Sequence, residues 1–299
     1  DRFAEYLYLP GSRYGMPCAG SARTVGALDA GTVRSFYTAR YVPQATTLIF
    51  VGDVAPEVVV RLVERAFGGW TGVLQGNTSV DDRALGGGPR VHVVDKRKAP
   101  QTELRVGHRA PARAHPDYFP IAVMNALLGG LFSSRINLNL REKHAFTYGA
   151  TSAFDWRRGS GPFLIATAVK TDVTAAAVRE ILAAIGKMRT ENVTADELSL
   201  ATDYLDGVFP IRYETTQAVA HATAIAEVFS LGEDYYSRYR ERIRAVSVDD
   251  VRRAAEQHLH PGELIIVAVG DAPAIQPSLE ALGVGPVKVH EVEPREATP

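Results

Sequence analysis

The chain has 299 residues, of which 46% are hydrophobic and 22% charged, as is ordinary for a globular protein. Its 33 basic and 34 acidic residues give a net charge of −1, so no overall field favours nucleic acid or a membrane surface. No apolar run approaches the roughly 18 residues that would suggest a membrane-spanning helix. The single cysteine, Cys18, excludes an intrachain disulfide and a cysteine-rich zinc site.

The N-terminal part of the chain predicts two helices around one strand. The first helix spans about 29–40, with Asp29 as its N-cap. Residues 46–51 form a β-branched apolar run of strand length, and apolar residues in 54–67 recur at helical spacing. From 72 to 89 the chain becomes polar and glycine-rich, which predicts a flexible linker between domains.

The part after the linker begins with strands, continues with helices and returns to a strand. The predicted strands are 91–94, 102–108, 148–156, 162–169 and 263–269. The predicted helices are 117–128, 133–143, 174–189, 197–206, 212–231, 233–245 and 247–258, and Thr194 with Glu197 forms a capping box. This order indicates an α+β fold, with helices packed on one face of a mostly antiparallel sheet. A doubly wound parallel fold is disfavoured because strands and helices do not alternate regularly.

One pattern occurs twice in the chain at a fixed offset. Val51-Gly52-Asp53 reappears as Val269-Gly270-Asp271, and 269 − 51 = 218 residues. The same offset places Pro43 on Pro261. The shared pattern is a helix, a proline-containing turn, a strand and another helix, which indicates two related units.

The repeat predicts two related α+β domains, of which the first is truncated. Residues 1–75 would be the C-terminal part of the first domain, 76–89 the linker, and 90–290 the complete second domain. The second copy begins near Pro89, and 89 − 218 = −129. We therefore expect the first copy to lack about its first 130 residues, a length taken from the repeat offset.

Two segments in the second domain carry a family resemblance. They are Leu127–Ile136, which contains Gly129-Gly130 and Ser133-Ser134, and Leu140–Gly149. Together they resemble the second domain of pitrilysin/insulinase-type zinc metalloproteases, in the branch of the mitochondrial processing peptidases and their bacterial relatives. Further landmarks follow in the family's order, so the resemblance covers nearly all of residues 10–285.

The resemblance implies two half-molecules that enclose a peptide-binding chamber. It also implies zinc held by an inverted His-x-x-Glu-His helix in the first domain of one half, with a downstream Glu as a further ligand. Neither His-x-x-Glu-His nor His-Glu-x-x-His occurs in this chain. The repeat offset places the zinc helix near position 120 − 218 = −98. We therefore predict no cofactor and no metal ligands in this chain, with the zinc on the missing domain or on a partner subunit.

The resemblance assigns substrate contacts to Arg141 and Tyr148. A guanidinium and a phenol O–H are donors suited to a peptide carbonyl oxygen that gains negative charge when water attacks. It also places Gly129–Gly130 and Ser133–Ser134 along the peptide path. Structural alternatives stay open, with Arg141 as a solvated cation at a helix end, Tyr148 packed under the next helix, and the glycines as a helix stop.

The histidines do not form a recognisable metal motif. His258 and His260 are two residues apart, and on a helix this spacing points them to different faces. His108 and His115 flank a loop with no acidic residue between them, so both are expected to be ordinary surface histidines.

The leading prediction is a subunit or fragment that supplies the Arg/Tyr half of a bacterial-type pitrilysin/insulinase-like peptidase. It would bind a peptide substrate, pair with a zinc-motif subunit or a second protomer, and be inactive alone. One alternative is a truncated piece of a complete zinc-bearing homodimeric peptidase. Another is a non-catalytic homologue like the core subunits of a respiratory complex. The sequence gives no compartment, although a periplasmic or envelope location would suit a bacterial member.

Overall fold

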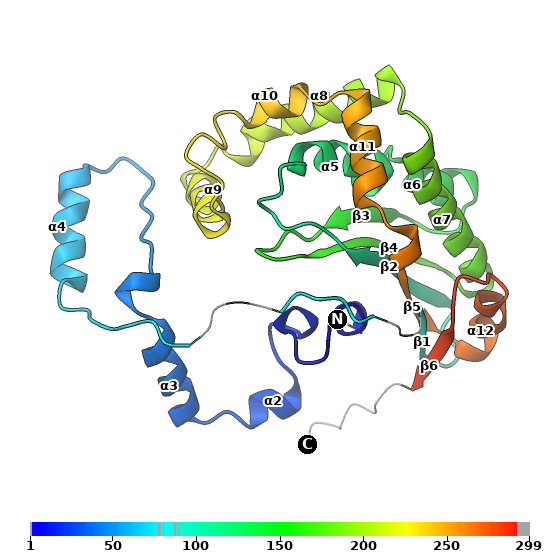
Figure 1. Ribbon diagram of the computed structural model, residues 1–299, viewed down its shortest axis with the longest axis horizontal. Coiled ribbons are helices and arrows are strands. Elements are labelled where there is room, and N and C mark those ends of the chain that lie inside the picture. The colour runs from blue at the N-terminus through cyan, green and yellow to red at the C-terminus, as the bar shows by residue number, and fades with distance from the viewer. Residues whose placement is uncertain (1, 77–78, 80, 87, 89, 292–299) are drawn as a thin grey trace.

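The computed structural model describes residues 2–76, 79, 81–86, 88 and 90–291, and a six-stranded sheet lies at its centre (Figure 1). The strands are β1 (Val91–Asp95), β2 (Gln101–Arg109), β3 (Ala150–Phe154), β4 (Pro162–Lys170), β5 (Ile265–Gly270) and β6 (Val287–Glu291). Their order is β3-β4-β2-β5-β1-β6. The first four pair antiparallel in turn, whereas β1 runs parallel to both β5 and β6. The predicted α+β class is confirmed.

Helices α5, α7 and α11 lie over one face of the sheet (Figure 1). The helices of this part are α5 (Tyr118–Asn125), α6 (Arg135–Asn137), α7 (Thr174–Thr190), α8 (Ala195–Arg212), α9 (Thr216–Phe229), α10 (Tyr239–Arg244), α11 (Val248–His258) and α12 (Ala272–Glu280). Leu104 and Ile165 of the strands are fully buried in one core with Ile121 and Ile181 of the helices. Each buried side chain of this size contributes about 1.5–3 kcal/mol, so the core fixes the helices on the sheet.

The N-terminal helix α1 (Arg2–Leu7) covers the opposite face of the sheet. Phe3 and Leu7 are buried in a second cluster with Val94, Ile265 and Val267. Successive side chains of a strand point to opposite faces, so β1 and β5 contribute to both clusters. The central strands are therefore covered on both sides.

The predicted linker, residues 76–89, is only partly described, since 77–78, 80, 87 and 89 lie outside the described residues. Its described part contacts the N-terminal segment. The Leu85 N–H donates to the Leu7 carbonyl oxygen at 2.9 Å, and the Arg109 guanidinium donates to the Asp82 carbonyl oxygen at 2.6 Å. These bonds hold residues 82–85 beside α1 and β2. The domain boundaries themselves stay a prediction.

The helices and the turn of the internal repeat have counterparts in the structure. Helix α3 (Ala30–Arg40) and the 3₁₀ turn η2 (Pro43–Ala45) have their counterparts in α11 and the turn η6 (Pro261–Glu263). The offset of 218 holds at both ends of each pair, since 248 − 218 = 30 and 261 − 218 = 43. Helix α4 (Pro56–Phe67) follows as the counterpart of α12. The first helix and the turn of the repeat therefore recur in the structure at the same offset.

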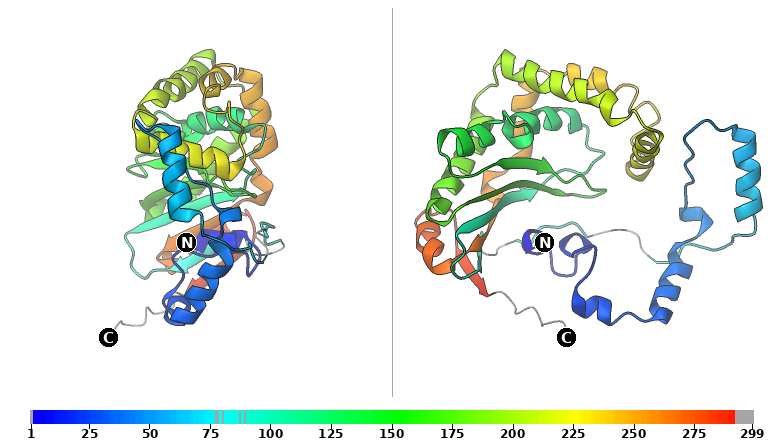
Figure 2. Two further views of the ribbon diagram at one scale, coloured as in Figure 1. Left: turned by 90° about the vertical axis from the view of Figure 1, so that its left-hand side faces the viewer. Right: turned by 180° about the vertical axis from the view of Figure 1, so that it is seen from behind.

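The predicted strand at 46–51 is wrong in this structure. The segment is assigned to no strand, and Leu48 and Phe50 are 43% and 54% exposed. Its counterpart β5 pairs with β1 and β2, but β1 begins at 91, and 91 − 218 = −127. A strand needs neighbours for its backbone N–H and C=O groups, and among the described residues the segment 46–51 joins no sheet. Figures 1 and 2 show α3, this segment and α4 reaching away from the main body, after the short helix α2 (Ala22–Gly26).

Among the described residues, one helical stretch, Tyr118–Lys143, is long and apolar enough to cross a membrane, with a mean hydropathy of 1.3. Of its most apolar 18-residue window, 56% is buried inside the fold. Ile121 and Leu128 of this stretch are fully buried in the main core. By length and composition alone, such a stretch is a weak indication of a membrane span.

The expectation that His108 is a surface histidine is wrong. His108 lies on β2 with 1% of its surface exposed. Its Nε2 accepts a hydrogen bond from the His260 backbone N–H at 3.2 Å, and its Nδ1 lies 2.6 Å from the Arg109 carbonyl oxygen. This arrangement fits the neutral ring with the proton on Nδ1. Burial lowers the pKa of His108 to about 4.

We expect His108 to make folding stability fall as the pH is lowered. The unfolded chain takes up the proton near pH 6.5 and the folded chain only near pH 4, so stability is lost between these values. Between pH 7 and pH 5 the loss from this residue is about 2 kcal/mol. Urea unfolding of the unmodified chain and of His108→Gln at both pH values measures it. Equal pH dependence in the two proteins would contradict the prediction.

Candidate functional site

The residues predicted to contact substrate lie on one stretch between α5 and β3 (Figure 1). The stretch contains two π-helical turns, η3 (Ala126–Gly130) and η4 (Leu138–Lys143). Such turns are rare and occur frequently at functional sites. The stretch leads into β3, which is an edge strand of the described sheet.

The glycine pair closes η3 against the edge strand. A Cβ atom on Gly129 would lie 2.5 Å from Ser152 Oγ and 2.6 Å from Ser152 N. Ser152 Oγ in turn donates to Asn125 Oδ1 at 2.7 Å, which ties the end of α5 to β3. Gly129 is therefore buried by close packing on β3, whereas Gly130 is exposed. The pair does more than end a helix, because the missing side chain of Gly129 lets the backbone of η3 lie close to the backbone of β3.

The two predicted serines have different surroundings. Ser133 is exposed, but Ser134 is only 2% exposed. Ser134 begins α6 as its N-cap residue without a side-chain capping bond, and its buried Oγ has no hydrogen-bond partner among the described residues. In this conformation only Ser133 presents its side chain to solvent.

Arg141 lies on η4 with 37% of its side chain exposed. Its guanidinium carbon is 4.6 Å from the centre of the Phe132 ring, which is a cation–π distance. Its Nε is 3.4 Å from Glu142 Oε1. Phe132 is itself 69% exposed. The ring therefore supports the arginine at the surface, a role that the sequence did not reveal.

Tyr148 is 91% exposed, so the structure does not bury it under the next helix. The backbone beside it is held by threonine side chains. The Gly149 N–H donates to Thr147 Oγ1 at 3.1 Å, and Thr167 Oγ1 donates to the Gly149 carbonyl oxygen at 3.0 Å. The turn is thus fixed on β4 while the phenol points outward.

Ala145 and Asn137 shape the path from Arg141 to Tyr148. Ala145 has a φ of 53°, and its N–H donates to the Arg141 carbonyl oxygen at 3.1 Å, which ends η4. A non-glycine residue in this left-handed conformation costs about 1–2 kcal/mol, and such strain clusters at functional sites. Asn137 is 4% exposed; its Nδ2 donates to the Phe132 carbonyl oxygen at 2.7 Å and its Oδ1 accepts from the Ala150 N–H at 3.0 Å. Asn137 therefore joins the backbone at Phe132 to the start of β3.

A cavity of about 920 Å³ lies elsewhere, between α8, α9 and the loop before α10. Its lining includes Phe209, Val219, Ala226 and Tyr236. None of the residues that line it belongs to the stretch with Arg141 and Tyr148. A smaller hollow of about 230 Å³ adjoins the stretch, with Gly130 and Leu131 in its lining.

The sequence contains no His-x-x-Glu-His motif, and the described surface carries the partly exposed Arg141 and the exposed Tyr148. A sequence profile of the peptidase M16 inactive domain matches residues 27–205. The chain belongs to the peptidase M16 family, which confirms the resemblance to pitrilysin-type enzymes.

Relatives of this chain are longer than it is. An uncharacterised zinc protease of Mycobacterium leprae is 26% identical over 256 residues, which are 82% of this chain and 56% of that protein. The chain therefore spans about half the length of the curated relative it matches.

Solved structures share the fold. The peptidase M16 inactive domain from Pseudomonas fluorescens has a TM-score of 0.79 at 19% identity, over 89% of this chain and 63% of that one. A chain of complex III2 from Candida albicans has a TM-score of 0.76 at 12% identity, over 93% of this chain and 68% of that one. At such identities, the likeness concerns the fold alone.

Proposed function

We propose that this chain supplies the substrate-holding part of an M16-type peptidase whose catalytic zinc lies on another domain or subunit. The observation that carries the proposal is the display of Tyr148. Its phenol is 91% exposed on a turn fixed by Thr147 and Thr167, and it follows closely after Arg141 on η4. A phenol O–H displayed in this way is accessible as a hydrogen-bond donor to a bound peptide.

The two side chains suit a peptide carbonyl group. Attack of water on the carbonyl carbon builds negative charge on the oxygen, and the Tyr148 O–H and Arg141 N–H groups would donate hydrogen bonds to it or to neighbouring carbonyls. Donors that are already oriented stabilise this charge without reorganisation. The Phe132 ring supports the Arg141 guanidinium, and Thr147 and Thr167 hold the backbone beside Tyr148.

The catalytic zinc implied by the family does not fit the residues of this chain. Among the described residues, the group whose ligand atoms converge is His115, Asp117 and His258, which comes from two separate elements. It is not an inverted motif on one helix. The chain therefore contributes donors and peptide contacts, with the exposed Gly130 and Ser133 along the peptide path beside Gly129 and Ser134.

A second candidate is a complete peptidase of which this chain is one part. It is favoured by the relative of Mycobacterium leprae, which is called a zinc protease and is matched over 56% of its length. In that case the zinc motif would lie on the same polypeptide, and a second protomer would complete the chamber. A purely structural homologue would instead bind a partner without any role for Arg141 or Tyr148.

A reconstitution assay tests the proposal. Hydrolysis of a fluorogenic peptide is measured with this chain alone, with a purified M16 domain that carries His-x-x-Glu-His alone, and with their mixture. We expect cleavage only in the mixture, and we expect this cleavage to depend on Arg141 and Tyr148. Cleavage by this chain alone, or a mixture in which Arg141→Ala and Tyr148→Phe change nothing, would overturn the proposal.

A further inference from the structure

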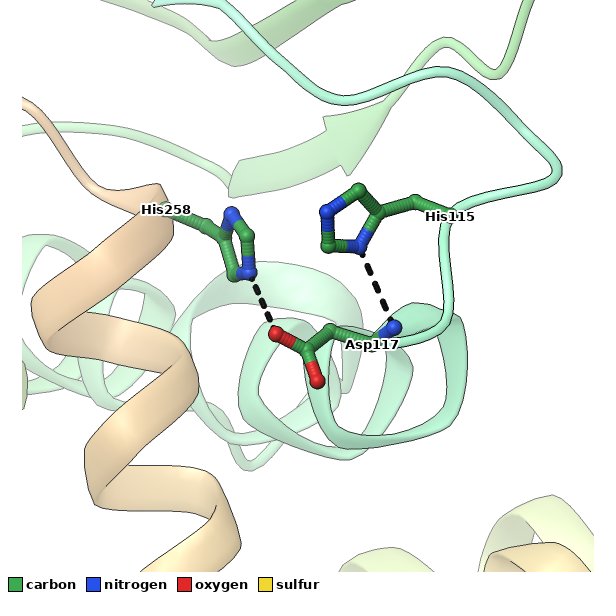
Figure 3. A group of neighbouring side chains, drawn as sticks. All are labelled: His115, Asp117 and His258. Carbon is green, nitrogen blue, oxygen red and sulfur yellow. Dashed lines mark hydrogen bonds and ion pairs between the residues drawn. The ribbon is translucent and has the colours of Figure 1, made fainter.

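Two side chains of the loop before α5 meet a third at the end of α11 (Figure 3). They are His115, Asp117 and His258, and one ligand atom from each lies within 4.8 Å of the others. His258 Nε2 is 2.8 Å from Asp117 Oδ2, and the His115 and His258 rings are 4.9 Å apart between centres. His115 Nδ1 accepts a hydrogen bond from the Asp117 backbone N–H at 3.1 Å.

The chemistry of this group matches that of metal ligands. Two imidazole nitrogens and one carboxylate oxygen form a donor set that suits Zn²⁺ and its neighbours, whereas Mg²⁺ prefers oxygen ligands alone. Zinc–ligand bonds of about 2.0–2.2 Å require ligand atoms roughly 3–4 Å apart. Atoms within 4.8 Å of one another need only a small rotation of a surface side chain to reach this spacing.

The surroundings keep the ligands in the required states. His258 Nε2 lies 2.8 Å from the acceptor Asp117 Oδ2, so this nitrogen carries the ring proton in this structure. The other tautomer, with the proton on Nδ1, presents the Nε2 lone pair to a metal. Hydrogen bonds with His258 and Arg253 outweigh burial and lower the pKa of Asp117. The Arg253 guanidinium donates to Asp117 Oδ1 at 2.7 Å, which leaves Oδ2 for a metal and orients the carboxylate.

We propose that His115, Asp117 and His258 bind a divalent transition-metal ion of the Zn²⁺ type. The ion binds between His258 Nε2 and Asp117 Oδ2 while the ring proton moves to His258 Nδ1, and His115 turns from the Asp117 N–H to complete the set. Bound in this way, it tethers the C-terminal end of α11 to the loop between β2 and α5. The site is separate from the substrate surface and does not depend on the proposed peptidase role.

The sequence could not reveal this group, because 258 − 115 = 143 residues separate the two histidines. The spacing of His115 and Asp117 alone matches no metal motif. The fold brings them together by packing α11 against α5.

Zinc titration of the full 299-residue chain tests the proposal. Isothermal titration with Zn²⁺ is carried out on the unmodified chain, on His115→Ala and on His221→Ala, which removes an exposed histidine of α9. We expect one Zn²⁺ per chain, a loss of affinity of at least about 100-fold in His115→Ala, and no change in His221→Ala. Mg²⁺ should not bind at this site.

A second measurement covers an effect on folding. Asp117→Asn keeps a hydrogen-bond acceptor for His258 but removes the charge, and Zn²⁺ should raise the Tm of the unmodified chain without raising that of this variant. The visible absorption of the Co²⁺-loaded chain should vanish in both site variants. Unchanged affinity in His115→Ala, an equal loss in His221→Ala, or the absence of saturable Zn²⁺ binding would overturn the proposal.

Discussion

Replacing Tyr148 by Phe is expected to lower kcat of the zinc-containing peptidase complex by about 100–1000-fold, the effect of removing one oxyanion donor. The phenol is 91% exposed, so its oxygen makes no packing contribution to the fold. Unfolding free energies of the two proteins should therefore agree within about 0.5 kcal/mol. Steady-state hydrolysis of a fluorogenic peptide, with urea unfolding in parallel, measures both quantities.

A matched control separates the effect of the Tyr148 hydroxyl on kcat from the effect of replacing any exposed tyrosine. Tyr37 of α3 is 56% exposed, and Tyr37→Phe should leave kcat unchanged. Arg141→Lys adds a second comparison, because an ammonium keeps the charge but lacks the planar fork that stacks on Phe132. Equal activity of Tyr148→Phe and the unmodified protein would remove Tyr148 from the site.

Much of the fold could be predicted because its helices bury one apolar face. Helices α7 and α11 begin and end within a residue or two of the predicted bounds, and the capping box of Thr194 and Glu197 is present. Local pattern and tertiary packing agree in these segments.

Prediction failed where the deciding partners are distant in the sequence. Residues 46–51 look like β5 but lack its neighbours, so the same pattern gives an unpaired segment. Strand β6 is short and mostly exposed, and it exists because β1 offers a parallel edge. Helix α8 continues to Arg212 through Pro210, past the predicted end at 206.

In the candidate site, too, the local motifs were predictable and the contacts between distant residues were not. The motifs placed Arg141 and Tyr148 on one stretch, and the structure exposes both at a sheet edge. No local pattern indicates that Asn137 bonds to both Phe132 and Ala150 or that Ser134 is buried. These features follow from the packing of the loop on β3, and this packing depends on contacts between residues distant in the sequence.

Gly129 is the residue on which this seating depends, and Gly129→Ala is expected to lower the free energy of unfolding by about 3 kcal/mol or more. The new Cβ would meet the backbone nitrogen of Ser152 at 2.6 Å, and a β-strand backbone cannot move aside as a flexible side chain can. Gly186 of α7 is the matched control, because a Cβ there meets nothing within 4 Å. Gly186→Ala should instead stabilise the helix by about 0.5–1 kcal/mol. Urea unfolding of both variants measures the difference, and a Gly129→Ala protein as stable as the unmodified chain would show that the loop does not rest on β3.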